Sequence, residues 1–548
     1  MLLSATSRKD TIKEITGQKF DLIVIGGGIT GAGVALDGAS RGINVLLLEK
    51  NDFASGTSSK STKLIHGGLR YLKQLEFGLV RKVGKERAVI YHLAPHLVIP
   101  VNMLLPIYKK GSLGRLSTSL ALWVYDFLAK VRKEDEYKML GKTQTQKEEP
   151  LLETKGLIGG AVYKEYRTDD ARLTLAVIKK AAEYGAKCLS YTEVKDFLRT
   201  GEKITGVLVK NKIGRDDFEV HADEVVNAAG PWADELRNLT NEKISKRLFL
   251  TKGIHVVAKK EKLPLKHAVY FDVPKDQRMI FAIPRGEIVY IGTTDTAYTG
   301  DNEKIPVLQH DITYLLNAVN ATFPSAHLKE NDIISSWAGL RPLIYEEGKS
   351  PSEVSRKDEI FFSEDGLITI AGGKLTGYRK MAMEVVDIAA ERLTKRTGKQ
   401  IPLSKTEHIK LFGADFSIPI EEFIERRTGE AKQVGLNKEV ITYLVYNYGT
   451  DAEKIIQTAF EIAQKIPNAE KRLLFAELKY CVEHEMTCTL SDFLVRRTGK
   501  MYFDKEAVLK NYKQVAIYLQ ELLELTEVQL QEQVKMFENE LFGLFTAS

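Results

Sequence analysis

Residues 20–50 carry the pattern that most restricts how this chain folds. An apolar run at 22–25 meets three consecutive glycines, a helical pattern of small residues follows, and a second apolar run at 45–48 ends in Glu49. A strand, a tight turn, a helix and a second strand within about thirty residues indicate a βαβ unit. This unit predicts that the chain opens with a parallel sheet.

The turn of this unit contains a GxGxxG motif made by Gly26, Gly28 and Gly31. The first glycine permits the turn, the second lets the backbone approach a pyrophosphate, and the third lets the helix pack on the strand. Glu49 follows about 20 residues on, where a carboxylate accepts hydrogen bonds from ribose hydroxyls. The sequence therefore predicts a bound dinucleotide, and Glu49 disfavours one with a 2′-phosphate because two anions repel.

Residues 56–72, GTSSKSTKLIHGGLRYL, follow closely and must leave the same edge of the sheet. Their serine and threonine hydroxyls and backbone amides are suited to lining the cofactor, and Gly67 and Gly68 let the chain pass close to a flat ring. Arg70 and Tyr71 are then expected beside that ring, where a substrate sits. The alternative is a Ser/Thr-rich turn with a solvated arginine.

Two later segments predict contacts with the same site. In EVVNAAGPWADEL an apolar strand ends in residues that leave no side chain to block a ligand. In LITIAGGKLTGYRK a strand, the Gly372–Gly373 turn and a helix follow one another. The N-terminus of that helix and the charge of Lys374 are suited to stabilising negative charge on a reduced ring.

Composition excludes several other classes of protein. The 548 residues have a net charge of +6, with lysines and arginines interleaved with acids, which disfavours nucleic acid as a partner. Three cysteines cannot form a disulfide framework, and no metal-binding motif occurs among the histidines. No apolar run reaches the ~20 residues of a membrane span, so any membrane contact is expected to be peripheral.

The motifs together resemble one family. VIGGGITGAG, GTSSKSTKLIHGGLRYL, APHLV, NAAGPW, TKGIH, GTTDT, WAGLRPL and AGGKLTGYR occur in this order across about 400 residues. The chain resembles the aerobic, respiratory, FAD-dependent glycerol-3-phosphate dehydrogenases.

The resemblance implies an α/β and α+β fold. A Rossmann-like FAD-binding domain of the D-amino-acid oxidase and glutathione reductase type is interleaved with an antiparallel-sheet substrate domain, and a helical domain follows. We assign residues 18–100, 150–250 and 345–400 to the FAD domain, 100–150 and 250–345 to the substrate domain, and 405–548 to the helical domain.

The family's motifs also imply the site. The residues implied to bind FAD are Gly26, Gly28, Ile29, Thr30, Gly31, Glu49, Lys50, Ser58, Ser59, Ser61, Thr62, Lys63, Leu64, His66, Gly67, Gly68, Ala229, Gly230, Gly372, Gly373, Lys374, Leu375 and Thr376. Those implied to surround glycerol 3-phosphate are Arg70, Tyr71, His255, Arg341 and Lys374.

The reaction implied is oxidation of the C2 hydroxyl, with hydride transfer to flavin N5 and loss of the hydroxyl proton to a base. His255 is the first candidate for that base because histidine titrates near neutral pH. Arg341 is the competing assignment, as an electrostatic stabiliser of a developing alkoxide. We expect His66 to contact or orient the flavin, and Thr293, Thr294 and Asp295 to shape the pocket.

The family's respiratory members pass electrons to a membrane quinone and take part in glycerol catabolism. Residues 105–133 are the candidate membrane surface, with apolar Trp123 and Phe127 flanked by cations. Those cations are Lys109, Lys110, Arg115, Lys130, Arg132 and Lys133. A core helix with solvated ends is the alternative.

This resemblance implies a cytoplasmic protein at the inner face of the cell membrane, and a homodimer is one possible state. Two other functions are weighed against the dehydrogenase. An oxidase would pass the electrons to oxygen instead, but the chain has no obvious extra internal segment of the kind that oxidase members carry. A non-catalytic flavoprotein would need neither a base nor so many cations.

Overall fold

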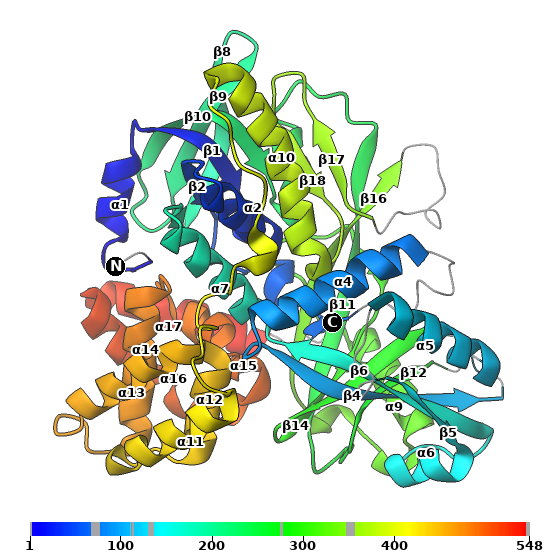
Figure 1. Cartoon of the computed structure of the whole chain (residues 1–548). Coiled ribbons are helices and arrows are strands. Elements are labelled where there is room, and N and C mark those ends of the chain that lie inside the picture. Colours follow the sequence, from blue (N-terminus) through cyan, green and yellow to red (C-terminus); the bar gives the residue numbers. More distant parts are fainter. Residues whose placement is uncertain are drawn as a thin grey trace.

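The computed structural model describes residues 3–66, 77–109, 111, 114–129, 136–273, 278–346 and 357–543. Two large sheets and a cluster of C-terminal helices make up the molecule (Figure 1). The first sheet lies in the upper part of the view, the second sheet at the lower right, and the C-terminal helices at the lower left (Figure 1).

The first sheet is built around a parallel core. Its strands are β1 (Lys19–Ile25), β2 (Val45–Leu48), β7 (Lys187–Leu189), β8 (Thr192–Thr200), β9 (Lys203–Asn211), β10 (Asp217–Asn227), β17 (Glu359–Phe362) and β18 (Ile368–Ala371). The parallel order is β18-β10-β1-β2-β7, and β8, β9 and β17 extend it in antiparallel fashion. All of β2 is buried, as expected for a parallel strand covered on both faces.

The predicted βαβ unit is confirmed by β1, α2 (Ile29–Ser40) and β2. α2 packs against α7 (Asp170–Glu183) on one side and α10 (Tyr378–Thr397) on the other. The approach of α10 is close, because a Cβ atom at Gly33 would lie 2.9 Å from the ring of Tyr378. The other helices in this part are α1 (Arg8–Ile15) and α8 (Ala233–Arg237).

The second sheet is antiparallel apart from one pair of strands. It contains β3 (Leu64–Ile65), β4 (Val98–Tyr108), β5 (Lys138–Gly141), β6 (Leu157–Thr168), β11 (Lys246–Lys259), β12 (Ala268–Asp272), β13 (Met279–Arg285), β14 (Ile288–Gly292), β15 (Thr296–Ala297) and β16 (Ile333–Glu346). The order is β15-β11-β14-β13-β12-β4-β6-β3, with β16 on β11 and β5 on β6. Only β12 and β4 run parallel among the strand pairs that the structure describes in this sheet.

Four helices lie around this second sheet: α4 (Phe77–Leu93), α5 (Arg115–Ala129), α6 (Lys142–Glu148) and α9 (Gln309–Thr322). The sheet also takes strands from ranges that we assign to the FAD domain. β3 and β6 fall within 18–100 and 150–250, yet β6 pairs with β4 along its whole length. Sequence pattern did not reveal this, because a strand's alternation is the same in either sheet.

The C-terminal part is helical, as predicted. It consists of α11 (Ile420–Ala431), α12 (Lys438–Tyr448), α13 (Ala452–Glu461), α14 (Ala469–His484), α15 (Lys500–Phe503), α16 (Lys505–Leu523) and α17 (Glu527–Gly543). A π-helix, η11 (Asp492–Arg497), precedes α15. In the part of the chain that the structure describes, no helix is both long and apolar enough to cross a bilayer.

Candidate active site

A cavity of about 690 Å³ lies between the two sheets. Its walls include the carboxyl ends of β1, β10 and β18 from the first sheet and residues of β11, β13 and β16 from the second. Open α/β sheets bind ligands at the carboxyl ends of their parallel strands. The volume also falls within the range of ~300–1,000 Å³ that is typical of ligand pockets.

The glycine turn after β1 forms part of the wall. Gly26 has a φ of +110°, and a Cβ there would lie 2.6 Å from the carbonyl oxygen of Ala228. A Cβ at Gly31 would collide with the carbonyl oxygen of Gly26, so only glycine lets α2 start this close to the turn. Gly28 is the N-cap of α2 and lines the cavity. A bare helix N-terminus of this kind suits a pyrophosphate.

Glu49 lies at the end of β2 and lines the cavity. Its carboxylate accepts hydrogen bonds from the Gly27 amide at 2.6 Å and the Asn51 amide at 2.8 Å. Burial raises the pKa of Glu49, against the effect of these two hydrogen bonds. The carboxylate therefore braces the glycine turn from the next strand, at the position where we expect the ribose.

The serine-rich loop begins with η1 (Thr57–Ser59). The Ser58 hydroxyl accepts a hydrogen bond from the Ile29 amide at 2.9 Å, so the loop caps α2 in place of a side chain at Gly28. Lys63 is buried and is not among the residues that line the cavity. Its ammonium pairs with Asp170 and donates to the Ser59 carbonyl at 3.0 Å.

The predicted FAD contacts divide into three groups. Lining the cavity are Gly26, Gly28, Ile29, Thr30, Glu49, Lys50, Ser58, Ser61, Thr62, Leu64, His66, Ala229, Gly230, Gly372, Gly373, Lys374, Leu375 and Thr376. Gly31, Ser59 and Lys63 are described but lie behind the lining. Gly67 and Gly68 lie outside the described residues, as do Arg70 and Tyr71, which are predicted to contact the substrate.

His255 lies on β11 between two cross-strand neighbours, Gly292 on β14 and Trp337 on β16. The imidazole stacks on the Trp337 indole at 4.7 Å between ring centroids, and a Cβ at Gly292 would collide with it. His255 Nε2 lies 3.0 Å from the Thr62 hydroxyl, and Nδ1 is buried without a hydrogen-bond partner. Burial, and then the charges of Arg341 and Lys63, lower the pKa of His255 well below its ordinary value.

Arg341 on β16 shares the cavity with His255. Its Nη1 donates to the Thr294 carbonyl and to Asp295 Oδ1, both at 3.2 Å, and its Nη2 donates to the Thr293 hydroxyl at 3.0 Å. The guanidinium passes over Gly253, where a Cβ would collide with it. Gly253 and His255 are two residues apart on one strand, so guanidinium and imidazole share one face of the sheet.

The turn after β18 brings Lys374 to the cavity. Gly372 and Gly373 both have a φ of +77°, which a side chain would strain. Lys374 then precedes η7 (Leu375–Gly377), which leads directly into α10. The Thr376 hydroxyl donates to the His66 carbonyl at 3.3 Å, which joins this turn to the serine-rich loop. Burial, then the charges of Lys374 and Arg87, lower the pKa of His66 well below its ordinary value.

Sequence reasoning missed several residues of the lining, among them Trp232 and Arg278. The Lys50 ammonium lies 4.1 Å from the centre of the Trp232 ring, and both residues line the cavity. Arg278 also lines it and donates to the Asp295 carbonyl at 3.0 Å. Trp232 ends the NAAGPW motif and could have been found there, whereas nothing in the sequence around Arg278 marks it.

These residues fit a flavin dinucleotide. The glycine turn brings backbone to the cavity without side chains that would fill it, and the loop adds hydroxyls from Ser61 and Thr62. The His255 imidazole stands on the rest of the wall, and six cationic residues of the described chain line the cavity as well: Lys50, Lys60, Lys195, Arg278, Arg341 and Lys374. No group of three metal-ligating side chains occurs among the described residues.

Comparisons with known proteins identify the family of this chain. The model of the FAD dependent oxidoreductase family matches residues 21–379, and that of the C-terminal domain of alpha-glycerophosphate oxidase matches residues 404–530. An aerobic glycerol-3-phosphate dehydrogenase of Staphylococcus epidermidis is 48% identical over 537 residues, which cover 96% of this chain and 95% of the relative.

Solved structures support the same relationship. The glycerol-3-phosphate dehydrogenase from Bacillus halodurans, complexed with FAD, superposes with a TM-score of 0.85 at 39% identity, with all of both chains covered. Glycine oxidase from Bacillus cereus has a TM-score of 0.51 at 23% identity over 68% of this chain and 98% of its own, which shows a shared fold alone.

The predicted fold class and the predicted cofactor, FAD, are confirmed by these matches together with the two sheets and the helical C-terminal part. The chain belongs to the family of FAD-dependent oxidoreductases that includes the aerobic glycerol-3-phosphate dehydrogenases.

Proposed function

We propose that this protein oxidises sn-glycerol 3-phosphate to dihydroxyacetone phosphate. The names of the relatives from S. epidermidis and B. halodurans support this substrate. One observation carries the proposal: His255 and Arg341 lie on the same face of β11 and β16. Both line the cavity that the glycine turn also lines.

Cations account for recognition of the substrate's phosphate. Arg341 presents a planar guanidinium that can bind two phosphate oxygens at once, and Lys374 adds a second charge on the cavity wall. Arg70 and Tyr71, which are also predicted to surround glycerol 3-phosphate, lie outside the described residues. A dianionic phosphate in a partly enclosed cavity needs more than one cation for neutralisation.

FAD, when bound, supplies the acceptor for the hydride that leaves C2. His255 Nε2 accepts the proton of the C2 hydroxyl, because its neighbour Thr62 lines the cavity whereas Nδ1 is buried. The lowered pKa keeps this imidazole neutral at pH 7 and so able to accept a proton. Arg341 is the competing candidate, stabilising negative charge on the C2 oxygen as the proton leaves.

A quinone is the proposed electron acceptor, and oxygen is the alternative. The dehydrogenase relative from S. epidermidis aligns over 95% of its length, which leaves no room for a large inserted segment in this chain. However, the family model for the C-terminal part is named after an oxidase. The acceptor therefore needs its own measurement.

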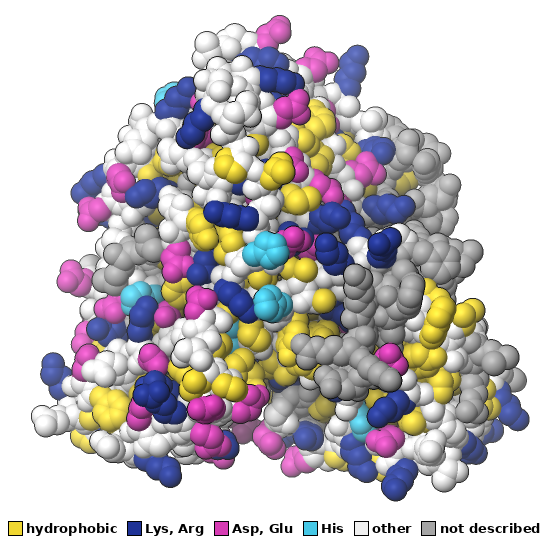
Figure 2. Space-filling model, in the orientation of Figure 1, with side chains coloured by type: hydrophobic (Ala, Val, Ile, Leu, Met, Phe, Trp, Pro, Cys, Tyr) yellow, Lys and Arg dark blue, Asp and Glu magenta, His cyan; other side chains and the backbone are white. Residues whose placement is uncertain are grey.

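Contact with the inner face of the cell membrane is proposed for α5. Leu122 is buried, whereas Leu120 and Trp123 are 62% and 56% exposed. Figure 2 shows hydrophobic side chains gathered over this helix. Lys109 is exposed just before it. The other predicted cations Lys110, Lys130, Arg132 and Lys133 lie outside the described residues, and no side chain is described for Arg115 or Phe127.

Steady-state assays test the reaction and the acceptor together. We expect dihydroxyacetone phosphate to form from glycerol 3-phosphate with a soluble quinone analogue, with little oxygen consumed on an oxygen electrode. Peroxide formation at the same rate without quinone would establish the oxidase instead. Absence of product with either acceptor, from protein that holds FAD, would reject the enzyme and favour the non-catalytic flavoprotein.

Sedimentation with anionic phospholipid vesicles tests the membrane proposal. We expect the wild type to pellet with the vesicles and the double variant Leu120→Ser, Trp123→Ser to remain largely in the supernatant. Ile517→Ser, which removes a 52% exposed apolar side chain on α16, is the matched control. Equal pelleting of the double variant and the wild type would contradict a role for α5.

A further inference from the structure

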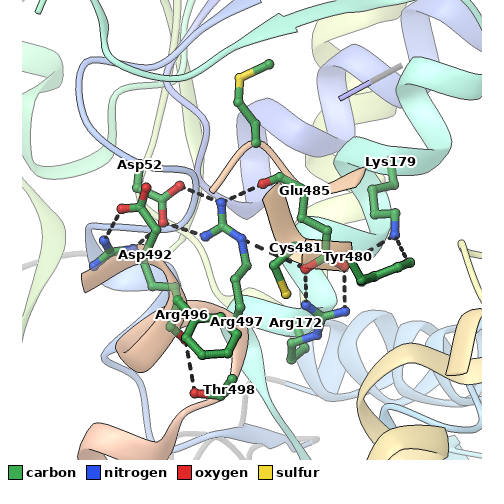
Figure 3. A network of polar contacts seen from close by, with 12 residues as sticks. Asp52, Arg172, Lys179, Tyr480, Cys481, Glu485, Asp492, Arg496, Arg497 and Thr498 are labelled. Atoms are coloured by element: carbon green, nitrogen blue, oxygen red, sulfur yellow. Dashed lines mark hydrogen bonds and ion pairs between the residues drawn. The ribbon is translucent and has the colours of Figure 1, made fainter. Parts of the chain in front are cut away.

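Buried charges fasten the C-terminal helices to the cofactor edge of the first sheet (Figure 3). Asp52 follows Glu49 in the segment between β2 and η1 and is only 1% exposed. Arg497 Nη1 and Nη2 donate to its two carboxylate oxygens at 2.6 and 2.8 Å, and Arg496 Nε donates as well. Both arginines belong to η11 in the helical domain.

The two arginines are themselves held within the helical domain (Figure 3). Arg496 Nη2 donates to Asp492 Oδ1 at 2.8 Å, and Arg497 Nη2 donates to the Glu485 carbonyl at 2.6 Å. Burial opposes ionisation of Asp52, but the two guanidiniums outweigh it and hold the pKa of Asp52 below its ordinary value. The bridge is therefore charged and buried, and its two arginines are also bound within the helical domain.

The segment that Asp52 anchors forms much of the cavity wall. Lining residues occur on both sides of it: Leu48, Glu49, Lys50, Ser55, Gly56, Thr57 and Ser58. Other contacts also hold the segment: the Tyr191 amide donates to the Asn51 carbonyl at 2.8 Å, and the Thr57 hydroxyl donates to the Leu340 carbonyl at 2.7 Å. The Ser55 amide donates to the Asp52 carbonyl at 3.1 Å, and the Ala54 amide donates to the Gly27 carbonyl at 3.0 Å, with Ala54 at a φ of +60°. A segment without regular secondary structure keeps one conformation only through contacts such as these and the bonds to Asp52.

A second buried bridge crosses the same interface without touching this segment. Arg172 on α7 donates to both carboxylate oxygens of Glu485, at 2.6 and 2.9 Å, and Lys179 donates to one of them at 3.2 Å (Figure 3). None of these three residues lines the cavity. This bridge is equally buried and fastens the helical domain to α7 instead. Its Glu485 also accepts a hydrogen bond from Arg497 through its carbonyl, so the comparison is between loss of the bonds to Asp52 and loss of the bonds to α7.

We propose that Arg496 and Arg497 are positioning residues of the FAD site, which act through Asp52 on the segment from Glu49 to Ser58. The helical domain then holds the wall of the dinucleotide site in its binding shape. The inference rests on the FAD site alone and is independent of the substrate, the base and the electron acceptor.

The test compares Arg497→Lys with Arg172→Lys. Lysine keeps the charge at both positions but loses the two-pronged hydrogen bonding. FAD affinity of the apoprotein is measured by quenching of FAD fluorescence. We expect Arg497→Lys to weaken FAD binding about 10-fold and Arg172→Lys to change it less than about 2-fold. Both variants should lower the melting temperature of the apoprotein, since both loosen one interface.

Hydrogen exchange gives a readout without FAD. In the apoprotein, amides of residues 50–58 should exchange faster in Arg497→Lys than in Arg172→Lys, whereas amides of α14 should respond alike. Equal FAD affinity in the two variants, with equal exchange in residues 50–58, would overturn the proposal. At saturating FAD, Arg497→Lys should recover wild-type kcat, which separates a positioning role from a catalytic one.

A milder variant covers the case in which Arg497→Lys fails to fold. Arg496→Lys leaves both bonds from Arg497 to Asp52 in place. We expect a loss of FAD affinity of about 3-fold, again with faster exchange confined to residues 50–58. Unchanged affinity and exchange in this variant would count against the proposal equally.

Discussion

The two walls of the active-site cavity are built in opposite ways. The cofactor wall, which is proposed to bind FAD, starts from the glycine turn, where Gly26 and Gly31 admit no side chain and Gly28 at the N-terminus of α2 lines the cavity. The substrate wall consists of side chains from distant segments, with His255 and Arg341 on neighbouring strands. Local sequence therefore determines the first wall, whereas strand register determines the second.

This contrast predicts that substitutions in the two walls have different effects. A change in the cofactor wall should cost the protein its flavin, because steric fit is lost for every ligand. A change in the substrate wall should leave the flavin bound and lower turnover. Single variants, taken from the largest expected effect to the smallest, test whether flavin binding and turnover are lost separately.

Gly31→Val should have the largest effect. Even a Cβ would collide with the carbonyl oxygen of Gly26, so α2 cannot start where it does. We expect purified protein without flavin absorbance, and circular dichroism shows whether it is otherwise folded. Gly429→Val on α11 is the matched control, since Gly429 is exposed, its Cβ would meet nothing within 4 Å, and it does not line the cavity. Flavin retained at wild-type level in Gly31→Val would refute the steric explanation.

His255→Gln should retain FAD but lower kcat by about 10³-fold, within the range for loss of a general base. Single-turnover reduction by glycerol 3-phosphate, followed at the flavin absorbance, is the measurement. His310→Gln on the exposed surface of α9 is the control. A kcat within a factor of about three of wild type would transfer the role of proton acceptor away from His255.

Arg341→Lys should lower kcat/KM by about 10²-fold, because lysine cannot form the two-pronged contact with phosphate or replace the guanidinium over Gly253. Steady-state kinetics with glycerol 3-phosphate measure it. Arg247→Lys, an exposed arginine on β11 away from the cavity, should change nothing. Unchanged kinetics in Arg341→Lys would remove this residue from the proposed subsite.

The pH dependence should be a smaller but diagnostic effect. A base must be unprotonated, so kcat/KM falls on the acid side as pH drops through the pKa of His255. Because that pKa is lowered, we expect the acid limb of the wild type to lie below the ordinary histidine value of about 6.5. In Arg341→Gln one of the lowering charges is gone, and the limb should move upward. An acid limb at the same pH in both proteins would contradict the electrostatic coupling of the two groups.

Ser58→Ala should have the smallest effect. It removes the hydroxyl that accepts a hydrogen bond from the Ile29 amide, which should cost about 1 kcal/mol of unfolding free energy, as for other helix caps. Urea denaturation of the apoprotein measures the loss. A stability equal to wild type would indicate that water replaces the hydroxyl fully.

The sequence predicts the glycine turn better than it predicts the surroundings of His255 and Arg341. The strand, glycine turn and helix at 19–40 could be predicted because each step is local. The environment of His255 could not, since it depends on a pairing with Trp337 that the register of two long strands decides. Lys63 is a further example: its contact with FAD stays a prediction, and nothing in the local sequence marks Asp170, which is distant in sequence, as the partner of its ammonium.

The sequence also did not show which of the two sheets each strand joins. The ranges assigned to the FAD domain included β6, because alternating apolar residues do not say which sheet a strand joins. The anchoring of Asp52 by Arg496 and Arg497 also escaped notice, since carboxylate and arginines are more than 400 positions apart. Nothing in either local sequence marks those residues as partners.

Anaerobic addition of sn-glycerol 3-phosphate to the purified holoprotein tests the central claim most directly. If the cavity presents C2 of this substrate to the flavin, the yellow absorbance bleaches and one dihydroxyacetone phosphate forms per flavin reduced. If the colour persists at saturating substrate while dithionite bleaches it, the cavity binds FAD but does not oxidise glycerol 3-phosphate.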